Sequence, residues 1–397
     1  MINRDLSLTA AWKFIILVGV VSLFSDLTYE GARSISGPFL GMLQASALVV
    51  GVVAGLGEFI GYALRFVSGF WTDRMGKYWP ISFVGYAFNL LAVPVLALAW
   101  RWEVAAGLLI VERLGRALRT PARDAMLSHA ASRVGPGWGF GFHEAMDQIG
   151  AVAGPLLVAG IIYLKGGYRA GFAALLAPAL VALAVLGLSA RLYPHPQHLE
   201  VSAPRLETTG FSRPYWLYIL AAGLMGAGYA DFPLIAYHFG KTGLASPSRI
   251  PLLYALAMGV DAVAALILGK LYDRLGRGFL AVVPLLSALC APLVFLGGFN
   301  WALAGMIFWG VGMGALESII KAPLAEMIPK ERRGTGFGLF HAGFGCFWLL
   351  GSVLMGYLYD LSLAALIAFS VLTQLAAIPV FFLVYRQLAP TGNGQQA

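Results

Sequence analysis

Long apolar segments, each of about the length needed to cross a lipid bilayer, follow one another along almost the whole chain. A membrane-spanning helix needs about 20 mostly apolar residues. Charged loops and Gly/Pro-rich turns divide the sequence into twelve such segments, at residues 13–39, 44–70, 78–99, 104–127, 138–163, 170–191, 214–239, 250–270, 279–298, 302–327, 336–359 and 362–386. Lipid offers backbone groups no hydrogen bonds, so such segments are expected to be helices. We therefore predict an all-α membrane protein with twelve transmembrane helices.

The composition argues against a soluble fold and against a nucleic-acid-binding protein. Hydrophobic residues make up 59% of the chain and charged residues only 12%, against roughly a quarter charged in soluble domains. The formal net charge is +8, but the basic residues stand in short loops, without a basic tail or a zinc-binding spacing. Cys290 and Cys346 lie in apolar segments and indicate neither a disulfide nor a metal site. We expect no cofactor, no metal and no nucleic-acid partner.

A polar stretch between the sixth and seventh apolar segments divides the chain in two. It predicts a six-helix bundle at residues 1–191, a cytoplasmic linker at 192–213 and a second six-helix bundle at 214–397. Most basic loop residues fall on the side shared by both termini, and the other side carries only Arg101, Lys165, Arg169, Lys241 and Arg249. Because cytoplasmic loops are enriched in Lys and Arg, we place both termini in the cytoplasm and the protein in the plasma membrane.

Three short motifs of the first half recur in the second half, in the same order. The pairs are Gly69–Lys77 with Gly269–Arg277, Arg119-Thr-Pro121 plus Asp124 with Lys321-Ala-Pro323 plus Glu326, and Gly139-Phe-Gly141 with Gly336-Phe-Gly338. Their common order predicts two halves of the same fold. In many carriers with such repeats, the solute site lies between the halves.

The loop that ends the second segment, Gly69-Phe-Trp-Thr-Asp73-Arg74-Met-Gly76-Lys77, resembles the signature loop of the major facilitator superfamily. The twelve segments, the repeat and the central linker extend this resemblance to essentially the whole chain. The resemblance implies two pseudo-symmetric bundles and a cluster of charges that latches them together in one state. A tight turn alone would explain the glycines and arginines but not the aspartates. The implied latch residues are Gly69, Asp73, Arg74, Gly76, Lys77, Asp124, Asp273, Arg274, Arg277 and Glu326.

Two further features bear on the kind of carrier. Gly150-Ala-Val-Ala-Gly154-Pro155 is similar to the antiporter motif of the family, although close helix packing through small residues explains it equally well. Proton-linked drug exporters of the family usually carry an arginine twelve residues before the proline of the fourth segment, which here is Pro121, and this chain has Leu109 at that place. The resemblance therefore favours an exporter without assigning it to the typical drug pumps.

Charged residues inside the predicted spans are the main candidates for a functional site. A charge at the bilayer centre costs on the order of 3 kcal/mol, so it is kept where it pairs or lines a hydrated cavity. Asp26, Glu30 and Arg33 share one helical face, and so do Glu112, Arg116, Arg119 and Arg123. We assign proton coupling first to Asp26 and Glu30, then to Glu144, Asp147 and His143. Substrate-binding candidates are Arg33, Glu58, Glu112, Arg113, Arg116, Tyr29, Tyr229, Asp231, Glu317, Lys321 and His341.

Two interpretations of this network remain open. In one, the charges line a polar cavity near the midplane, where Arg113 or Arg116 holds an anionic group of the substrate. In the other, they are ion pairs that hold the helices of the first half together. For Arg119 and Arg123, near the end of the fourth segment, the structural role is favoured, because long basic side chains reach toward the interface.

We expect a secondary active transporter that moves a small organic solute by alternating access, with proton-coupled efflux favoured by the resemblance. A passive facilitator or a translocase for lipids or amphiphiles is the alternative. The chain contains no Gly-rich nucleotide loop, no H-E-x-x-H and no G-x-S-x-G, so we do not expect an enzyme. The expected partners are the solute, protons and the lipid bilayer, and the expected assembly is a monomer.

Overall fold

The computed structural model describes residues 2–75, 78–194, 211–321, 323–328 and 333–388, and these residues form helices with short connections and no strand. The predicted linker at 192–213 lies largely outside these ranges. The helices are α1 (Ile2–Met42), α2 (Ala47–Met75), α3 (Tyr78–Val95), α4 (Trp102–Val134), α5 (Pro136–Lys165), α6 (Tyr168–Ala174), α7 (Leu176–Leu192), α8 (Arg213–Gly228), α9 (Phe232–Thr242), α10 (Arg249–Leu275), α11 (Val282–Ala288), α12 (Cys290–Leu296), α13 (Phe299–Glu317), α14 (Leu324–Met327), α15 (Arg333–Leu361) and α16 (Leu363–Leu388), with short 3-10 turns η1 (Leu96–Leu98), η3 (Arg277–Ala281) and η4 (Ile319–Lys321).

The predicted all-α membrane fold is confirmed. Eleven helical segments of the described residues are long and apolar enough to cross a membrane. The remaining predicted span is α4, which has 33 residues and therefore a length of about 50 Å. Its charges keep its average hydropathy low, but α4 packs against α1, α2, α3 and α5, so Glu112 and Arg119 are buried among helices. Average hydropathy therefore underestimates the ability of α4 to span a membrane, because charged side chains such as Glu112 and Arg119 face protein and not lipid.

Several predicted spans are interrupted rather than continuous helices. The seventh, predicted at 214–239, is α8 followed by α9, with Tyr229 and Asp231 in extended conformation between them. Pro233 lacks an N–H group and sits at the first turn of α9, where a proline is tolerated. The tenth, predicted at 302–327, ends as α13 at Glu317 and continues as η4 and α14. The break between α8 and α9 places the buried Asp231 at the N-terminus of α9.

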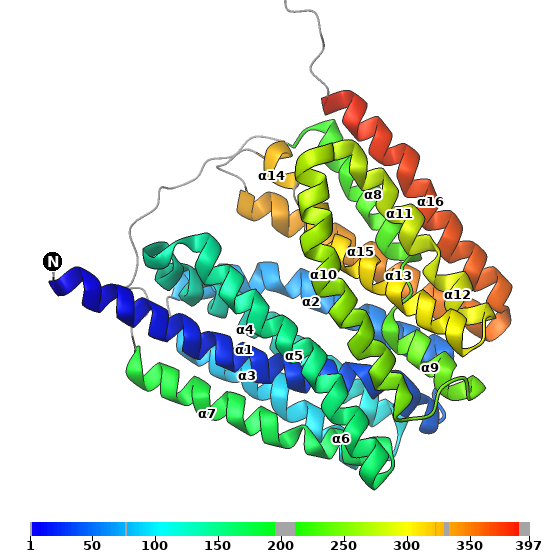
Figure 1. Cartoon of the computed structure of the whole chain (residues 1–397), viewed down its shortest axis with the longest axis horizontal. Helices are drawn as coiled ribbons and strands as arrows, with labels where there is room; N and C mark the ends of the chain where they lie inside the picture. Colours follow the sequence, from blue (N-terminus) through cyan, green and yellow to red (C-terminus); the bar gives the residue numbers. More distant parts are fainter. Residues whose placement is uncertain (1, 76–77, 195–210, 322, 329–332, 389–397) are drawn as a thin grey trace, which may run out of the picture.

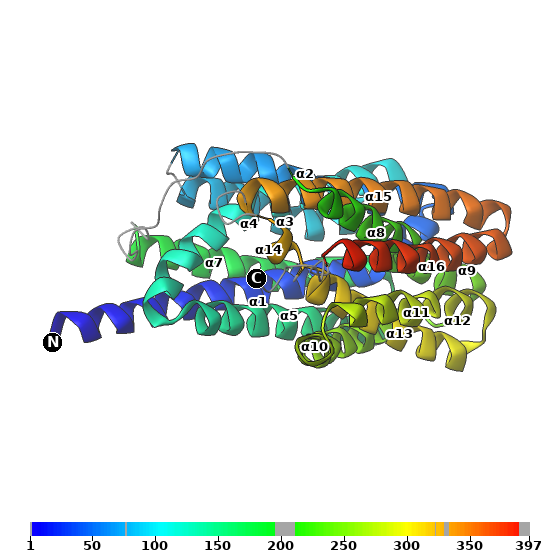
Figure 2. The same ribbon diagram turned by 90° about the horizontal axis from the view of Figure 1, so that it is seen from above.

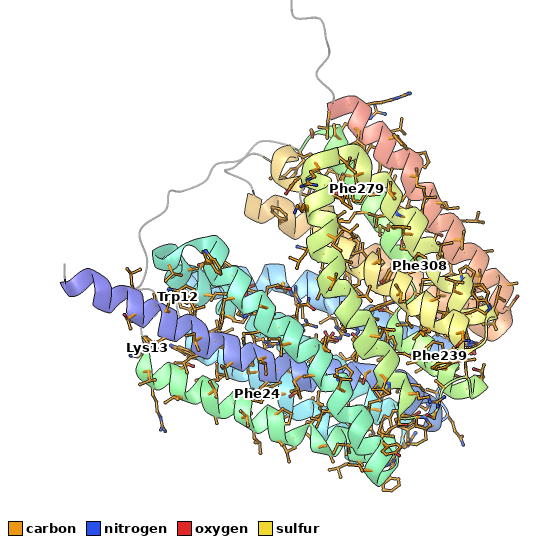
Figure 3. The ribbon with its side chains drawn as sticks, in the orientation of Figure 1. Trp12, Lys13, Phe24, Phe239, Phe279 and Phe308 are labelled. Carbon is orange, nitrogen blue, oxygen red and sulfur yellow. The ribbon has the colours of Figure 1, made fainter. Side chains whose placement is uncertain are left out.

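The helices of the first half (α1–α7) and of the second half (α8–α16) meet along two seams. Figure 2 shows α2 beside α15 at one edge and α5 beside α10 at the opposite edge, and both pairs are in contact. In Figure 1 the halves meet at one end and diverge toward the other, where α1 begins and α16 ends. We call this diverging end the terminal side and the opposite end the far side. Figure 3 shows Trp12 and Lys13 near the terminal side and Phe239 near the far side.

Close backbone contacts join the halves on the far side. The second part of α1 packs against α9, and a Cβ atom added at Gly37 would overlap the carbonyl group of Pro233. The backbone N–H of Leu48 at the start of α2 donates a hydrogen bond of 3.1 Å to the Asp360 carboxylate at the end of α15. Such contacts hold the far side shut between the halves.

Candidate functional site

A cavity of about 450 Å³ lies between the halves and is lined by α1, α2, α4 and α5 on one side and by α10 and α13 on the other. We call it the outer cavity. Asp124 lies in the last third of α4, and Ser318 directly follows α13, so both lining residues belong to the ends of these helices that lie toward the terminal side. A depression of about 590 Å³ on the far side, lined among others by Tyr237 and Lys241, shares no lining residue with it. The outer cavity therefore faces the terminal side.

A smaller pocket of about 130 Å³, which we call the inner pocket, adjoins the outer cavity. The two share the lining residues Glu30, Arg33, Arg65, Arg116, Met313 and Glu317. Of the residues that the sequence predicts for the site, Asp26, Glu144 and Asp147 line the outer cavity, and Glu58 and Arg113 line the inner pocket. Helices α1, α2, α4 and α5 together thus bring most of the predicted charges to one place.

Asp26 pairs with Arg119 inside the first half. The Arg119 Nη2 atom lies 3.5 Å from Asp26 Oδ1, and the Arg119 side chain is 1% exposed. Its guanidinium also stacks on the ring of Tyr86, 4.5 Å from the centroid. Arg119 thus forms an ion pair of the kind favoured for it from the sequence, but the carboxylate of α1 and the ring of α3 hold its side chain inside the bundle and not toward the interface.

Arg123 joins α4 to α5 and α1 near the terminal side. It pairs with Asp124 at 2.9 Å and with Asp147 at 3.6 Å, and it donates a hydrogen bond of 3.3 Å to Ser22 Oγ. His143 lies 2.6 Å from the same hydroxyl through Nε2 and 3.6 Å from Asp147 through Nδ1. This group of contacts therefore links three helices, α1, α4 and α5.

Glu58 of α2 is shared by two arginines. Its Oε1 atom lies 3.1 Å from Arg33 Nη2 and 3.0 Å from Arg113 Nη1. Arg113 also contacts Glu112, whose carboxylate accepts a hydrogen bond of 2.5 Å from Asn89. Glu112 therefore faces α3 and lines neither the inner pocket nor the outer cavity.

The ring of Tyr29 lies between two guanidinium groups of α4. Arg116 stands 4.0 Å and Arg113 4.8 Å from its centroid. Such cation–π contacts attract a cation to the face of the ring. Arg116 approaches a carboxylate only loosely, with 4.0 Å between its Nη1 atom and Glu30 Oε1. Its N–H groups are therefore available on the cavity wall.

Among the described residues, Glu30 and Arg33 of α1 each make a buried polar contact with the second half. Tyr254 of α10 donates a hydrogen bond of 2.6 Å to Glu30 Oε2 of α1. Arg33 of α1 lies 3.5 Å from Asp231 Oδ1 at the start of α9. The other Asp231 oxygen accepts hydrogen bonds from Trp348 Nε1 at 2.9 Å and Ser352 Oγ at 2.7 Å. Both crossing contacts must break when the halves separate on the far side.

Other predicted residues lie away from the cavity or outside the described side chains. Tyr229 is buried against Trp309 and Trp348 and donates its hydroxyl hydrogen to the Trp309 carbonyl. His341 of α15 stacks on Tyr62 of α2, with the ring planes 4° apart. The side chain of Lys321 lies outside the described part of the chain.

Most of the predicted latch also lies outside the described side chains, namely Gly69, Asp73, Arg74, Gly76, Lys77, Arg277 and Glu326. The described members stand apart in two places. Asp124 pairs with its neighbour Arg123 on the cavity wall, and Asp273 and Arg274 are exposed at the end of α10.

Three residues of the site carried no assigned role in the sequence prediction. Arg65 and Asp261 line the outer cavity, and Tyr254 bonds to Glu30. Arg65 and Asp261 are recognisable from the sequence as charges inside apolar segments, the same signal that identified Asp26, but this signal assigned neither of them a role. No signal distinguished Tyr254 from the fifteen other tyrosines of the chain, which has 16 in all.

The sequence matches known proteins over most of its length. The profile described as the Major Facilitator Superfamily matches residues 19–322 and 231–397. An uncharacterized protein of Mycobacterium tuberculosis (strain ATCC 25618 / H37Rv) is 39% identical over 382 residues, which are 94% of this chain and 93% of that protein. An uncharacterized MFS-type transporter of Methanocaldococcus jannaschii is 25% identical over 91% of this chain and 90% of its own. The crystal structure of the nucleoside transporter NupG superposes with a TM-score of 0.74 at 12% identity, covering 95% of this chain and 99% of that one.

Proposed function

The chain belongs to the major facilitator superfamily, and we propose that this transporter exports a small organic solute by alternating access in exchange for protons. The observation that carries the proposal is the outer cavity, which is rich in charged side chains and lies between two halves whose described helices meet on the far side and diverge toward the terminal side. Charges are costly inside a membrane, so a bundle that served structure alone would do without them. A hydrated crevice between rocking halves gives these charges a use, because a solute and protons must reach them from each side in turn.

Proton exchange is proposed for Asp26 and Glu30 of α1, with Glu144, Asp147 and His143 of α5 as a second group. Asp26 pairs within the first half, with Arg119, whereas Glu30 accepts its hydrogen bond from the second half. A carboxylate of Glu30 therefore favours the state closed on the far side. Its protonation removes the charge that strengthens this bond, which eases separation of the halves.

We place the terminal side in the cytoplasm and the protein in the plasma membrane as a monomer. The support is the excess of basic loop residues on the side of the termini. In this orientation the outer cavity faces the cytoplasm, from which an exporter loads its solute. The similarity of Gly150–Pro155 to an antiporter motif supports exchange with protons rather than co-transport.

A lipid or amphiphile translocase is supported less well by the cavity than a carrier of polar solutes. Long acyl chains need an apolar lining, but arginines and carboxylates dominate the wall of the outer cavity. A passive facilitator remains the second candidate, since the same cavity would serve it.

The experiment uses Asp26→Asn, Glu30→Gln and the control Glu103→Gln, an exposed glutamate on the far side. A thermal-shift screen of the purified protein at two pH values selects solutes that bind. Proteoliposomes then report accumulation of a selected solute driven by a proton gradient and, separately, exchange of labelled for unlabelled solute. We expect the Asp26 and Glu30 variants to lose driven accumulation and retain exchange, while the control keeps both. Unchanged driven accumulation in both variants would contradict proton coupling at these residues, and wild-type flux insensitive to an uncoupler would indicate a facilitator.

A further inference from the structure

Among the charged side chains that line the outer cavity, Arg65 of α2 and the buried Asp261 of α10 have no ion-pair partner within the described residues. We propose that these residues, together with Arg116, bind a small zwitterionic solute, with its anionic group at the arginines and its cationic group at Asp261. This inference rests on the proposed function, because it names the chemical class of the transported solute.

Among the arginines of α1, α2 and α4 whose side chains are described, Arg65 alone forms no ion pair with a described carboxylate, and the longest pair of the others joins Arg116 to Glu30 at 4.0 Å. Arg33, Arg113, Arg119 and Arg123 each have a carboxylate within 3.6 Å. Arg65 has no such partner in the described part of the chain, its buried Nε has no hydrogen-bond acceptor there, and its guanidinium lies 5.8 Å from the centroid of the Tyr62 ring. An unpaired guanidinium on a cavity wall is suited to a carboxylate or phosphate, which it can bind with two parallel hydrogen bonds.

Arg116 supplies a second guanidinium on the same wall. It lines both the inner pocket and the outer cavity, as Arg65 does. Its contact with Glu30, at 4.0 Å, is the longest ion pair of the arginines in the cavity. Because the Tyr29 ring supports one face of this guanidinium, its edge N–H groups are left for an anion. Two arginines from different helices thereby define one anionic subsite.

Asp261 is the corresponding unpaired acid in the second half. Its side chain is 2% exposed, yet it lines the outer cavity, and its Oδ1 atom has no hydrogen-bond donor among the described residues. No basic side chain of these residues forms an ion pair with it. Gly314 of α13 allows the close approach that fixes this carboxyl, since a Cβ there would lie 3.1 Å from Oδ1. A buried carboxylate of this kind gains most from a cation that enters with the solute.

The distribution of charge gives the solute an orientation. The inner pocket is lined by four arginines and three carboxylates, whereas the outer cavity is lined by four arginines and seven carboxylates. The anionic end of a solute is therefore favoured toward the inner pocket and the cationic end toward the outer cavity. A solute with one charge sign would leave either Arg65 or Asp261 uncompensated. The cavity volume of about 450 Å³ is within the range of sites for small molecules.

The test compares charge classes on shared molecular skeletons. A panel of amino acids is assembled in which each member is present as the zwitterion, as its N-acetyl anion and as its carboxamide cation. Binding to the full-length protein in detergent is measured by thermal shift and titration. We expect zwitterions to stabilise the protein and both singly charged forms to bind at least about tenfold more weakly, because each loses one charge-assisted contact. The proposal is overturned if an anion or a cation binds as tightly as the zwitterion of the same skeleton, or if no zwitterion of the panel stabilises the protein.

Variants assign the two ends of the solute. Arg65→Gln should weaken the binding of the zwitterion and of the anion about tenfold or more and leave the binding of the cation unchanged. Asp261→Asn should reduce the affinity for the zwitterion to that for its N-acetyl anion. Arg101→Gln and Glu103→Gln, which change an exposed far-side pair, are matched controls that should bind like the wild type. Arg65→Lys, which keeps the charge but not the planar fork, replaces Arg65→Gln if the latter does not fold, and it should also weaken binding. Wild-type binding by either cavity variant would refute its assigned contact.

Transport of the bound compounds separates this inference from the proposed function. If an anion or a cation binds best and is exchanged across proteoliposomes, the protein is a transporter and the zwitterion site is wrong. If zwitterions bind as described but are not exchanged, the site stands and the transport function fails.

Discussion

Replacing Tyr254 with phenylalanine removes one oxygen atom from the contact between the halves. The hydroxyl of Tyr254 donates its hydrogen to Glu30 at 2.6 Å, and this bond joins α10 to α1. The ring itself packs on Phe232 and Trp309, with centroids 4.2 Å and 5.9 Å away, and phenylalanine keeps that packing. The substitution therefore tests the bond rather than the fold.

The expected effect follows from burial. Tyr254 is 0% and Glu30 6% exposed, so water does not replace the bond readily in the state closed on the far side. A hydrogen bond to a charged group contributes about 1.5–3 kcal/mol, which is roughly a 10- to 150-fold change in an equilibrium constant. Opening of the far side breaks this bond in the wild type, so Tyr254→Phe should favour the opened state by that factor. A wild-type population of about 1% in that state would rise to roughly 10–60%.

Distances between spin labels measure the shift. Labels at Gln44 and Ser246, both exposed in far-side loops, report separation of the halves there. Labels at Lys13 and Lys270, both exposed on the terminal side, report the opposite motion. The exposed Cys346 is first replaced by serine so that it does not react. We expect longer far-side and shorter terminal-side distances in Tyr254→Phe.

The control is Tyr357→Phe, which removes a hydroxyl from a side chain that is 49% exposed. It should leave both distance distributions unchanged. If Tyr254→Phe also gives wild-type distributions, the bond does not contribute to far-side closure. A change on only the terminal side would contradict the coupled motion of two halves.

Two further substitutions test the packing of the site. Arg119→Gln leaves the carboxylate of Asp26 buried without its cation and should lower the free energy of unfolding by about 3–5 kcal/mol. The apparent unfolding temperature in detergent should therefore fall, and adding Asp26→Asn should restore part of the loss. An unchanged unfolding temperature would show that the ion pair is dispensable. Gly37→Leu should prevent far-side closure, because its side chain would overlap the Pro233 carbonyl. The distance between spin labels at Gln44 and Ser246 should increase in this variant. The control is Gly160→Leu, because a Cβ added at Gly160 has no neighbour within 4 Å, and it should leave the distance unchanged. Equal distances in both variants would contradict the steric argument.

The transmembrane fold could be predicted from local features of the sequence. Hydropathy over about 20 residues is a property of each segment alone, so the spans could be recognised without knowing their neighbours. The same approach did not find the break at Asp231 within the predicted span 214–239, because the apolar pattern continues through it and Pro233 is compatible with the first turn of a helix. It also failed for α13, whose helix ends at Glu317 although the predicted span runs to 327.

Spacing along a helix determined which charges share a face, but not which partner each charge meets. Asp26, Glu30 and Arg33 lie on one face of α1 by their sequence positions alone. Their partners, Arg119 in α4, Tyr254 in α10 and Asp231 before α9, come from three other elements. Those pairings depend on the rotation and depth of each helix in the bundle, which long-range packing sets. The sequence thus determined a membrane carrier with charges in its interior, and only the tertiary structure decided which of these charges form ion pairs and which, like Arg65 and Asp261, have no ion-pair partner among the described residues.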